Sequence, residues 1–231
     1  MHPEKPTTFL LILIFLFAST GPITSTPYLP SLINISSQFN SSISIVQFTT
    51  TLFFLGYGFS RLIYGIASDK FGRKLPLIFG LCVFFIGSTV CYFASHMDAL
   101  LVGRFLQGLG VGGSNVLARI ILRDHTKSKH LPRYYSYYSM VNITTMIATP
   151  VIGGYLQEYY GWQPNFLLLL AYSLIILFFA IFFFKESNLH LKPDAMDSRI
   201  LSANFKLLFP TKILSFFLFC FCSHMDAWLV G

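Results

Sequence analysis

The chain has 231 residues, of which 54% are hydrophobic and only 11% are charged, and its formal net charge is +7 at pH 7. Soluble domains carry roughly 25% charged residues, so a water-soluble fold holding 26 Phe would lack the polar surface to cover them. The composition therefore indicates a membrane protein. The four cysteines lie in apolar runs that lack the spacing of a zinc site or a disulfide framework, and we expect no metal and no cofactor.

Six stretches have the length and apolar character of transmembrane helices, because a bilayer core needs about 20 helical residues. They span residues 8–28, 43–67, 75–94, 99–122, 134–156 and 165–184. Residues 185–212 are polar and carry both signs of charge, which predicts a linker between two bundles. Residues 213–231 begin a seventh transmembrane helix that is incomplete. We therefore expect an all-α integral membrane fold with a six-helix bundle over residues 1–184.

Lysine and arginine are confined to alternate connections between these stretches. The connections 29–42, 95–98 and 157–164 contain neither residue, whereas the amino-terminal tail and the other connections carry them. The positive-inside rule then places the amino terminus and the 185–212 linker in the cytoplasm, for a multi-pass protein of the inner or plasma membrane. Because the basic charge is divided among loops instead of forming one face, it argues against a nucleic-acid partner.

Three arginines remain within the predicted helices. Arg61 and Arg119 lie near cytoplasmic helix ends, from which their side chains can snorkel to water. Arg104 lies about 7–8 Å inside the outer start of its helix at 1.5 Å per residue, and Gln107 shares its face. A charge at the centre of a transmembrane helix costs roughly 2.5–3.5 kcal/mol, so we expect Arg104 to face a polar cavity.

The nine acidic residues lie in tails, in connections or at the ends of segments. A proton-driven pump usually carries a titratable group on its route through the membrane. The fourth stretch contains no acidic residue in its interior but several glycines, and Gly108 and Gly112 have the spacing that allows close helix approach. We interpret these glycines as packing residues.

The segment GIASDKFGRK after the second stretch resembles the signature of the major facilitator superfamily. Its pattern is Gly-x-x-x-Asp-(Arg/Lys)-x-Gly-Arg-(Arg/Lys), and it is filled by Gly65, Asp69, Lys70, Gly72, Arg73 and Lys74. The resemblance implies a half-bundle with a three-plus-three helix repeat, and substrate bound between two such halves. It also implies that these residues form a conformational latch at the cytoplasmic face, in which Asp69 meets the positive end of a helix in the other half.

Further segments resemble that superfamily and, within it, the bicyclomycin-resistance (Bcr/CflA) group of multidrug efflux proteins. Arg104 and Gln107 resemble the fourth-helix motif associated with a proton or substrate route. The chain also resembles this group at three short segments, which are Tyr28-Leu29-Pro30, Leu117 to Asp124 and Gly161-Trp162. Pro150, Gly153 and Gly154 resemble the antiporter motif of helix five. The chain departs from the pattern at Thr26, where the group commonly has Asp, and Thr cannot carry a proton.

These resemblances imply a transporter that exports drugs or other small molecules by alternating access, with proton antiport. Its partners would be a small-molecule substrate, protons and the lipid bilayer, and either a missing carboxy-terminal half or a second copy would complete it. We expect the polar residues of the cavity to be Thr26, Tyr28, Asn142 and Thr145.

An alternative function stays open at the level of sequence. The chain could be a truncated, inactive transporter remnant or a membrane interaction protein. An enzyme is not indicated, because the sequence has no phosphate-binding loop, no metal constellation and no paired intramembrane carboxylates.

Overall fold

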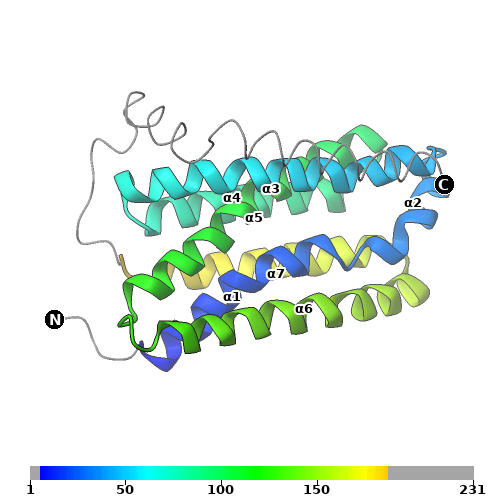
Figure 1. Cartoon of the computed structure of the whole chain (residues 1–231). Helices are drawn as coiled ribbons and strands as arrows, with labels where there is room; N and C mark the ends of the chain where they lie inside the picture. The colour runs from blue at the N-terminus through cyan, green and yellow to red at the C-terminus, as the bar shows by residue number, and fades with distance from the viewer. Residues whose placement is uncertain (1–5, 187–231) are drawn as a thin grey trace, which may run out of the picture. The chain divides into compact units, whose positions relative to one another are not determined.

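The computed structural model describes residues 6–186, so the predicted seventh helix and most of the predicted linker lie outside the described residues. Within residues 6–186 the fold is entirely helical (Figure 1). The elements are α1 (Thr8–Ser25), η1 (Leu29–Ser31), α2 (Leu32–Gln38), α3 (Ile43–Phe71), α4 (Lys74–Tyr92), α5 (Met97–Asp124), α6 (Leu131–Tyr160) and α7 (Gln163–Phe182).

Within residues 6–186, five helical segments are long and apolar enough to cross a membrane, when α1, η1 and α2 are taken together as Thr8–Gln38. The other four are α3, α4, α5 and α7. Helix α6 has 30 residues, but its first half (LPRYYSYYSMVNITT) is rich in hydroxyl and amide groups, and it is not among the spans identified by composition. It nevertheless packs against α1 and α7 within the same bundle.

Several helix ends differ from the sequence prediction by up to four residues, and α6 (Leu131–Tyr160) extends beyond the predicted 134–156 at both ends. Helix α3 continues to Phe71 instead of ending at residue 67, so Asp69 and Lys70 lie in its last turn and not in a connection. The first predicted span breaks after Ser25 and resumes as η1 and α2. Proline explains this break, because Pro27 and Pro30 lack the backbone N–H that a continuing helix needs.

Helix α5 packs closely against α3 and α4 (Figure 1). A Cβ atom on Gly108 would overlap the carbonyl oxygen of Phe53 in α3, and one on Gly110 would overlap the backbone nitrogen of Phe84 in α4. The absence of a side chain at these positions lets the three backbones approach, as in other helix pairs of membrane proteins. The interpretation of the glycines as packing residues is confirmed.

Gly110→Ala should destabilise the bundle, because the added methyl group would overlap the backbone of α4. Overpacking of this kind costs about 1–3 kcal/mol, so the thermal unfolding midpoint of the purified chain in detergent should fall. Gly58→Ala in α3 is the matched control, because a Cβ there meets no atom within 4 Å. Equal midpoints for the two variants would contradict the close packing of α5.

Candidate functional site

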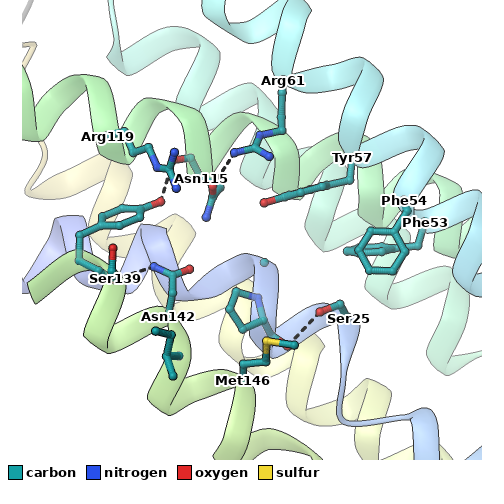
Figure 2. A pocket seen from close by; sticks show the side chains of 14 residues that line it. Ser25, Phe53, Phe54, Tyr57, Arg61, Asn115, Arg119, Ser139, Asn142 and Met146 are labelled. Atoms are coloured by element: carbon teal, nitrogen blue, oxygen red, sulfur yellow. Dashed lines mark hydrogen bonds between the residues drawn. The ribbon is translucent and has the colours of Figure 1, made fainter. Parts of the chain in front are cut away.

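A cavity of about 470 Å³ is lined by residues from α1, α3, α5 and α6 (Figure 2). Its apolar part includes Phe53, Phe54 and Met146. Its polar part is formed by Tyr57, Arg61, Asn115, Arg119, Tyr138, Ser139 and Asn142. The cavity therefore combines aromatic surface with a group of hydrogen-bond donors, which is the usual chemistry of a small-molecule site.

Two arginines on neighbouring helices turn toward this cavity. Figure 2 shows Arg61 of α3 and Arg119 of α5 directed to the space around Asn115. Arg61 donates from Nη2 to Asn115 Oδ1 at 3.3 Å, and its guanidinium carbon lies 4.9 Å from the centre of the Tyr57 ring. The Arg119 guanidinium carbon lies 5.1 Å from the centre of the Tyr138 ring, and this side chain also hydrogen-bonds to Tyr138.

The sequence favoured snorkelling for Arg61 and Arg119, and the structure places both side chains at the cavity. Arg61 precedes the end of α3 by ten residues, which is about 15 Å along the helix axis. Polar and aromatic partners hold its side chain there. The Asn115 amide is itself fixed, because its Nδ2 donates to the Ala18 carbonyl of α1 at 2.9 Å.

The cavity has a positive charge that no carboxylate of the described chain balances. No Asp or Glu from residues 6–186 lines it. Over the same residues, the ion pairs are formed by Arg73 and Arg123 and do not involve Arg61 or Arg119. The cavity is therefore electropositive and, within the described part of the chain, partnered only by neutral groups.

Of the four residues expected at the cavity, only Asn142 lines it, where its Nδ2 donates to the Tyr138 carbonyl at 2.9 Å. Thr26 is buried and shares a 2.8 Å hydrogen bond with Thr149 of α6. Tyr28 is fully buried, and its hydroxyl bonds to α3. Thr145 donates to the Val141 carbonyl at 2.7 Å. These three residues therefore do not line this cavity.

Arg104 lies in the packed interior and does not line the cavity, in contrast to the expectation. Its side chain is 0% exposed and donates from Nη1 to the Thr24 carbonyl at 3.0 Å and to Gln107 Oε1 at 2.8 Å. The guanidinium carbon lies 4.1 Å from the Tyr28 ring centre and 4.6 Å from that of Phe53. These neutral partners replace water around the charge. A part for Arg104 and Gln107 in a proton or substrate route stays a prediction.

The expected latch residues form a charged cluster at the adjoining ends of α3, α4 and α5. Arg73 is its centre, with a side chain only 6% exposed. It donates from Nη1 to Asp69 Oδ1 and Ser68 Oγ, each at 2.7 Å, and from Nε to Asp124 Oδ2 at 3.1 Å. The Asp69 side chain is 47% exposed. One buried guanidinium therefore ties α3 to α5 and leaves part of Asp69 open to a further partner.

Glu186 completes this cluster and was missed by the sequence analysis. Its carboxylate accepts from the backbone N–H groups of Arg73 at 2.7 Å and Lys74 at 3.0 Å, at the amino-terminal end of α4. A carboxylate at this end of a helix satisfies orphan donors and complements the helix dipole. Lys74 Nζ also donates to the Ile181 carbonyl of α7 at 3.0 Å. Glu186 follows α7 and reaches the start of α4 because α7 packs beside α4. No pattern of neighbouring residues in the sequence could therefore reveal this contact.

The two glycines of the latch motif have different environments. Gly72 has φ +87°, in the left-handed region that favours glycine, and a Cβ there would lie 2.6 Å from Glu186 Oε2. Gly65 lies within α3, where a Cβ would meet nothing within 4 Å. Of the two glycines, Gly72 therefore shapes the turn.

Lys70, the remaining residue of the motif, extends over the Phe71 ring, with Nζ 5.2 Å from the ring centre.

In the helix-five motif, Gly153 is the residue that packing requires. A Cβ on Gly153 would overlap the carbonyl oxygen of Pro27, which follows α1. At Gly154 the nearest atom would be Cγ of Pro30 at an ordinary 3.9 Å. Pro150 lies inside α6, one turn before Gly153. The motif thus brings α6 against the break that follows α1.

Apolar helices of membrane-spanning length, packed around buried polar groups, define a multi-pass helical membrane protein. Sequence comparison makes this more specific. Residues 8–230 match the sequence pattern of the Major Facilitator Superfamily, and the chain belongs to this family. Proteins of this family are transporters and not enzymes, which agrees with the class that the sequence indicated.

The relatives agree with the resemblance to the bicyclomycin-resistance group, which is confirmed. Multidrug resistance protein D of Escherichia coli (strain K12) is 28% identical over 87% of this chain and 50% of its own length. A bicyclomycin resistance protein homolog of Haemophilus influenzae is 28% identical over 92% of this chain and 53% of its own length. An uncharacterized transporter of Rickettsia bellii is 32% identical over 70% of this chain and 39% of its own length. The chain thus spans about half the length of these relatives.

A solved structure of a peptide transporter POT mutant in complex with alafosfalin has the same fold. Its TM-score is 0.70 at 15% sequence identity, and the match covers 93% of this chain and 48% of that one. At this identity the likeness concerns the fold alone, and it agrees with the helical membrane architecture expected from the sequence.

Arg73→Lys should destabilise the chain, because an ammonium group cannot reproduce the fork that reaches Asp69, Ser68 and Asp124 together. We expect a loss of about 1–2 kcal/mol in the free energy of unfolding, reduced by the exposure of Asp69. Unfolding of the purified chain by detergent titration measures it.

Arg123→Lys is the control, since Arg123 is 61% exposed and lies 3.9 Å from Asp124. It should leave the free energy of unfolding nearly unchanged. Equal losses for the two variants would show that Arg73 has no special part in joining the helices.

Glu186→Ala should loosen the first turn of α4, because two backbone N–H groups lose their acceptor. Amide hydrogen exchange in residues 73–77, read by mass spectrometry, should accelerate roughly two- to fivefold, as expected for the loss of a helix cap. Glu158→Ala, at an exposed site near the end of α6, should leave this segment unchanged. Unaltered exchange in the Glu186 variant would rule out the cap.

Proposed function

We propose that this chain forms one six-helix half of a small-molecule exporter that works by alternating access. The observation that carries the proposal is the cavity of polar and aromatic side chains between α1, α3, α5 and α6, which is of a size to hold a small molecule. Its relatives include proteins named for multidrug and bicyclomycin resistance. Because those relatives are about twice as long as the match, we propose that a complementary half, or a second copy, covers the cavity.

The charged cluster around Arg73 would act as the conformational latch of this exporter. Arg73 holds Asp69 at the end of α3, while nearly half of the Asp69 side chain stays exposed. A helix amino terminus from the complementary half could dock on this carboxylate. The distribution of basic residues supports a cytoplasmic position for the cluster, the amino terminus and the 185–212 linker, in the inner or plasma membrane.

Proton antiport is the coupling that the family resemblance implies. Within residues 6–186 no carboxylate lines the cavity, and Thr26 occupies the position where the related group commonly has Asp. We therefore assign the proton-binding carboxylate of the proposed cycle to the complementary half.

Dye accumulation in efflux-deficient bacteria tests the proposed function. The 231-residue chain would be expressed alone and joined to the carboxy-terminal half of a relative, with membrane abundance measured for each. We expect lower dye accumulation than in cells without the protein when the chain is joined to the carboxy-terminal half, or when two copies of the chain complete the cavity. If neither form lowers accumulation although both are present in the membrane, the transporter function is wrong and the inactive remnant is favoured.

Asn115→Leu should slow this efflux by about tenfold, because it removes the amide that contacts Arg61 and the α1 backbone. Asn34→Leu makes the same chemical change at an exposed position of α2 and should leave the efflux rate unaltered. Equal rates in the two variants would remove the cavity from the proposed transport route.

A further inference from the structure

The two cavity arginines differ from the other arginines of the described chain in their position or in what surrounds them. Arg73 contacts two carboxylates, and Arg123 lies beside one of them. Arg133 donates to the Tyr137 hydroxyl at an exposed position outside the cavity. Arg104 is enclosed by aromatic rings and has no access to solvent. Arg61 and Arg119 have neutral partners within residues 6–186, yet both line an open cavity. They are therefore cations that an entering solute can reach.

Each guanidinium retains hydrogen-bonding capacity toward the cavity. A guanidinium carries five N–H donors, and over residues 6–186 the hydrogen-bond acceptor of Arg61 is Asn115 Oδ1 at 3.3 Å. That distance is long for a charge-assisted bond. The planar fork of arginine matches the two oxygens of a carboxylate or the oxygens of a sulfonate. The geometry can therefore accept an anionic group without first breaking an ion pair.

The charge of the cavity favours an anion. Arg61 is half-buried and Arg119 is exposed, and two like charges that line one cavity repel each other. A neutral solute would leave this repulsion in place, and a cationic solute would add to it. An anion bound between Arg61 and Arg119 compensates both charges at once.

The remainder of the lining specifies the body of the solute. Figure 2 shows Phe53, Phe54 and Met146 away from the arginines, with the Tyr57 ring between Arg61 and the two phenylalanines. Aromatic side chains and methionine favour flat or branched apolar groups. A volume of about 470 Å³ is large enough for a solute of one or two rings.

We propose that the cavity is selective for small aromatic anions, with the carboxylate or sulfonate held between Arg61 and Arg119 and the ring against Phe53, Phe54 and Met146. This inference rests on the proposed function, since it names the substrate class of the proposed cavity. It extends beyond what the names of the relatives state, because those names specify no charge for the transported compound.

Three probes of one shape and different charge test the selectivity. Naphthoate, naphthylmethanol and naphthylmethylammonium would be titrated by calorimetry into the purified 231-residue chain in lipid nanodiscs, with empty nanodiscs as the blank. We expect naphthoate to bind at least tenfold more tightly than the neutral alcohol, and the ammonium probe to bind most weakly. This preference should shrink as salt is raised, because the cavity is open to solvent.

Variants identify the site of binding. Arg61→Gln and Arg119→Gln should each weaken naphthoate binding by about tenfold and leave the alcohol nearly unchanged. Arg133→Gln removes the same charge at an exposed position outside the cavity and should leave naphthoate binding unaltered. Arg61→Lys retains the charge without the fork, and it should keep the preference for the anion at reduced affinity.

The outcomes separate this proposal from the proposed function. Equal binding of the three probes would overturn anion selectivity while leaving a ligand cavity in place. If the affinity for naphthoate is unchanged in both Gln variants, the anion binds elsewhere in the chain and the proposal is also overturned. If no probe binds but dye efflux is observed, transport stands and the anion site is wrong. If a Gln variant does not fold, the order of the three probes on the unaltered chain and on Arg61→Lys decides the question.

Discussion

The close backbone contact of α5 with α3 and α4 is the constraint on which the rest of this bundle depends. Gly108 and Gly110 leave no room for even a methyl group, so the position of α5 relative to both neighbours is fixed by steric overlap. Because α5 also carries Asn115 and Arg119, this contact sets them beside Tyr57 and Arg61 of α3. The cavity is therefore built on closely packed helices.

The same helix joins the cavity to the charged cluster at its carboxy-terminal end. Asp124 is the last residue of α5 and accepts from Arg73, whereas Arg119 lies little more than one turn earlier and lines the cavity. Helices move as rigid elements when packed domains rearrange. Because α5 is fixed against α3 and α4, a movement of these three helices as one unit would carry Arg119 and the cluster around Arg73 together, which links the substrate site to the latch in the proposed exporter.

Sequence reasoning recovered the helical membrane fold because apolar length and loop charge are properties of contiguous residues. It also identified the residues of the charged cluster that is proposed as a latch, which lie in one short segment, and the packing glycines. It expected Thr26, Tyr28 and Thr145 at the cavity and favoured snorkelling for Arg61 and Arg119, whereas the two arginines line the cavity and those three residues do not. The rotation of a helix about its axis decides which side chains face inward, and that rotation depends on neighbours distant in sequence. Glu186 was missed for the same reason.

The burial of Arg104 has a consequence for the order in which the chain enters the membrane. Its guanidinium donates to the carbonyl of Thr24, a residue 80 positions earlier in the chain, and is flanked by rings from Tyr28 and Phe53. Alone in lipid, α5 would expose this charge to hydrocarbon. Insertion of α5 beside α1 and α3 would supply these partners at once and would spare the arginine that exposure.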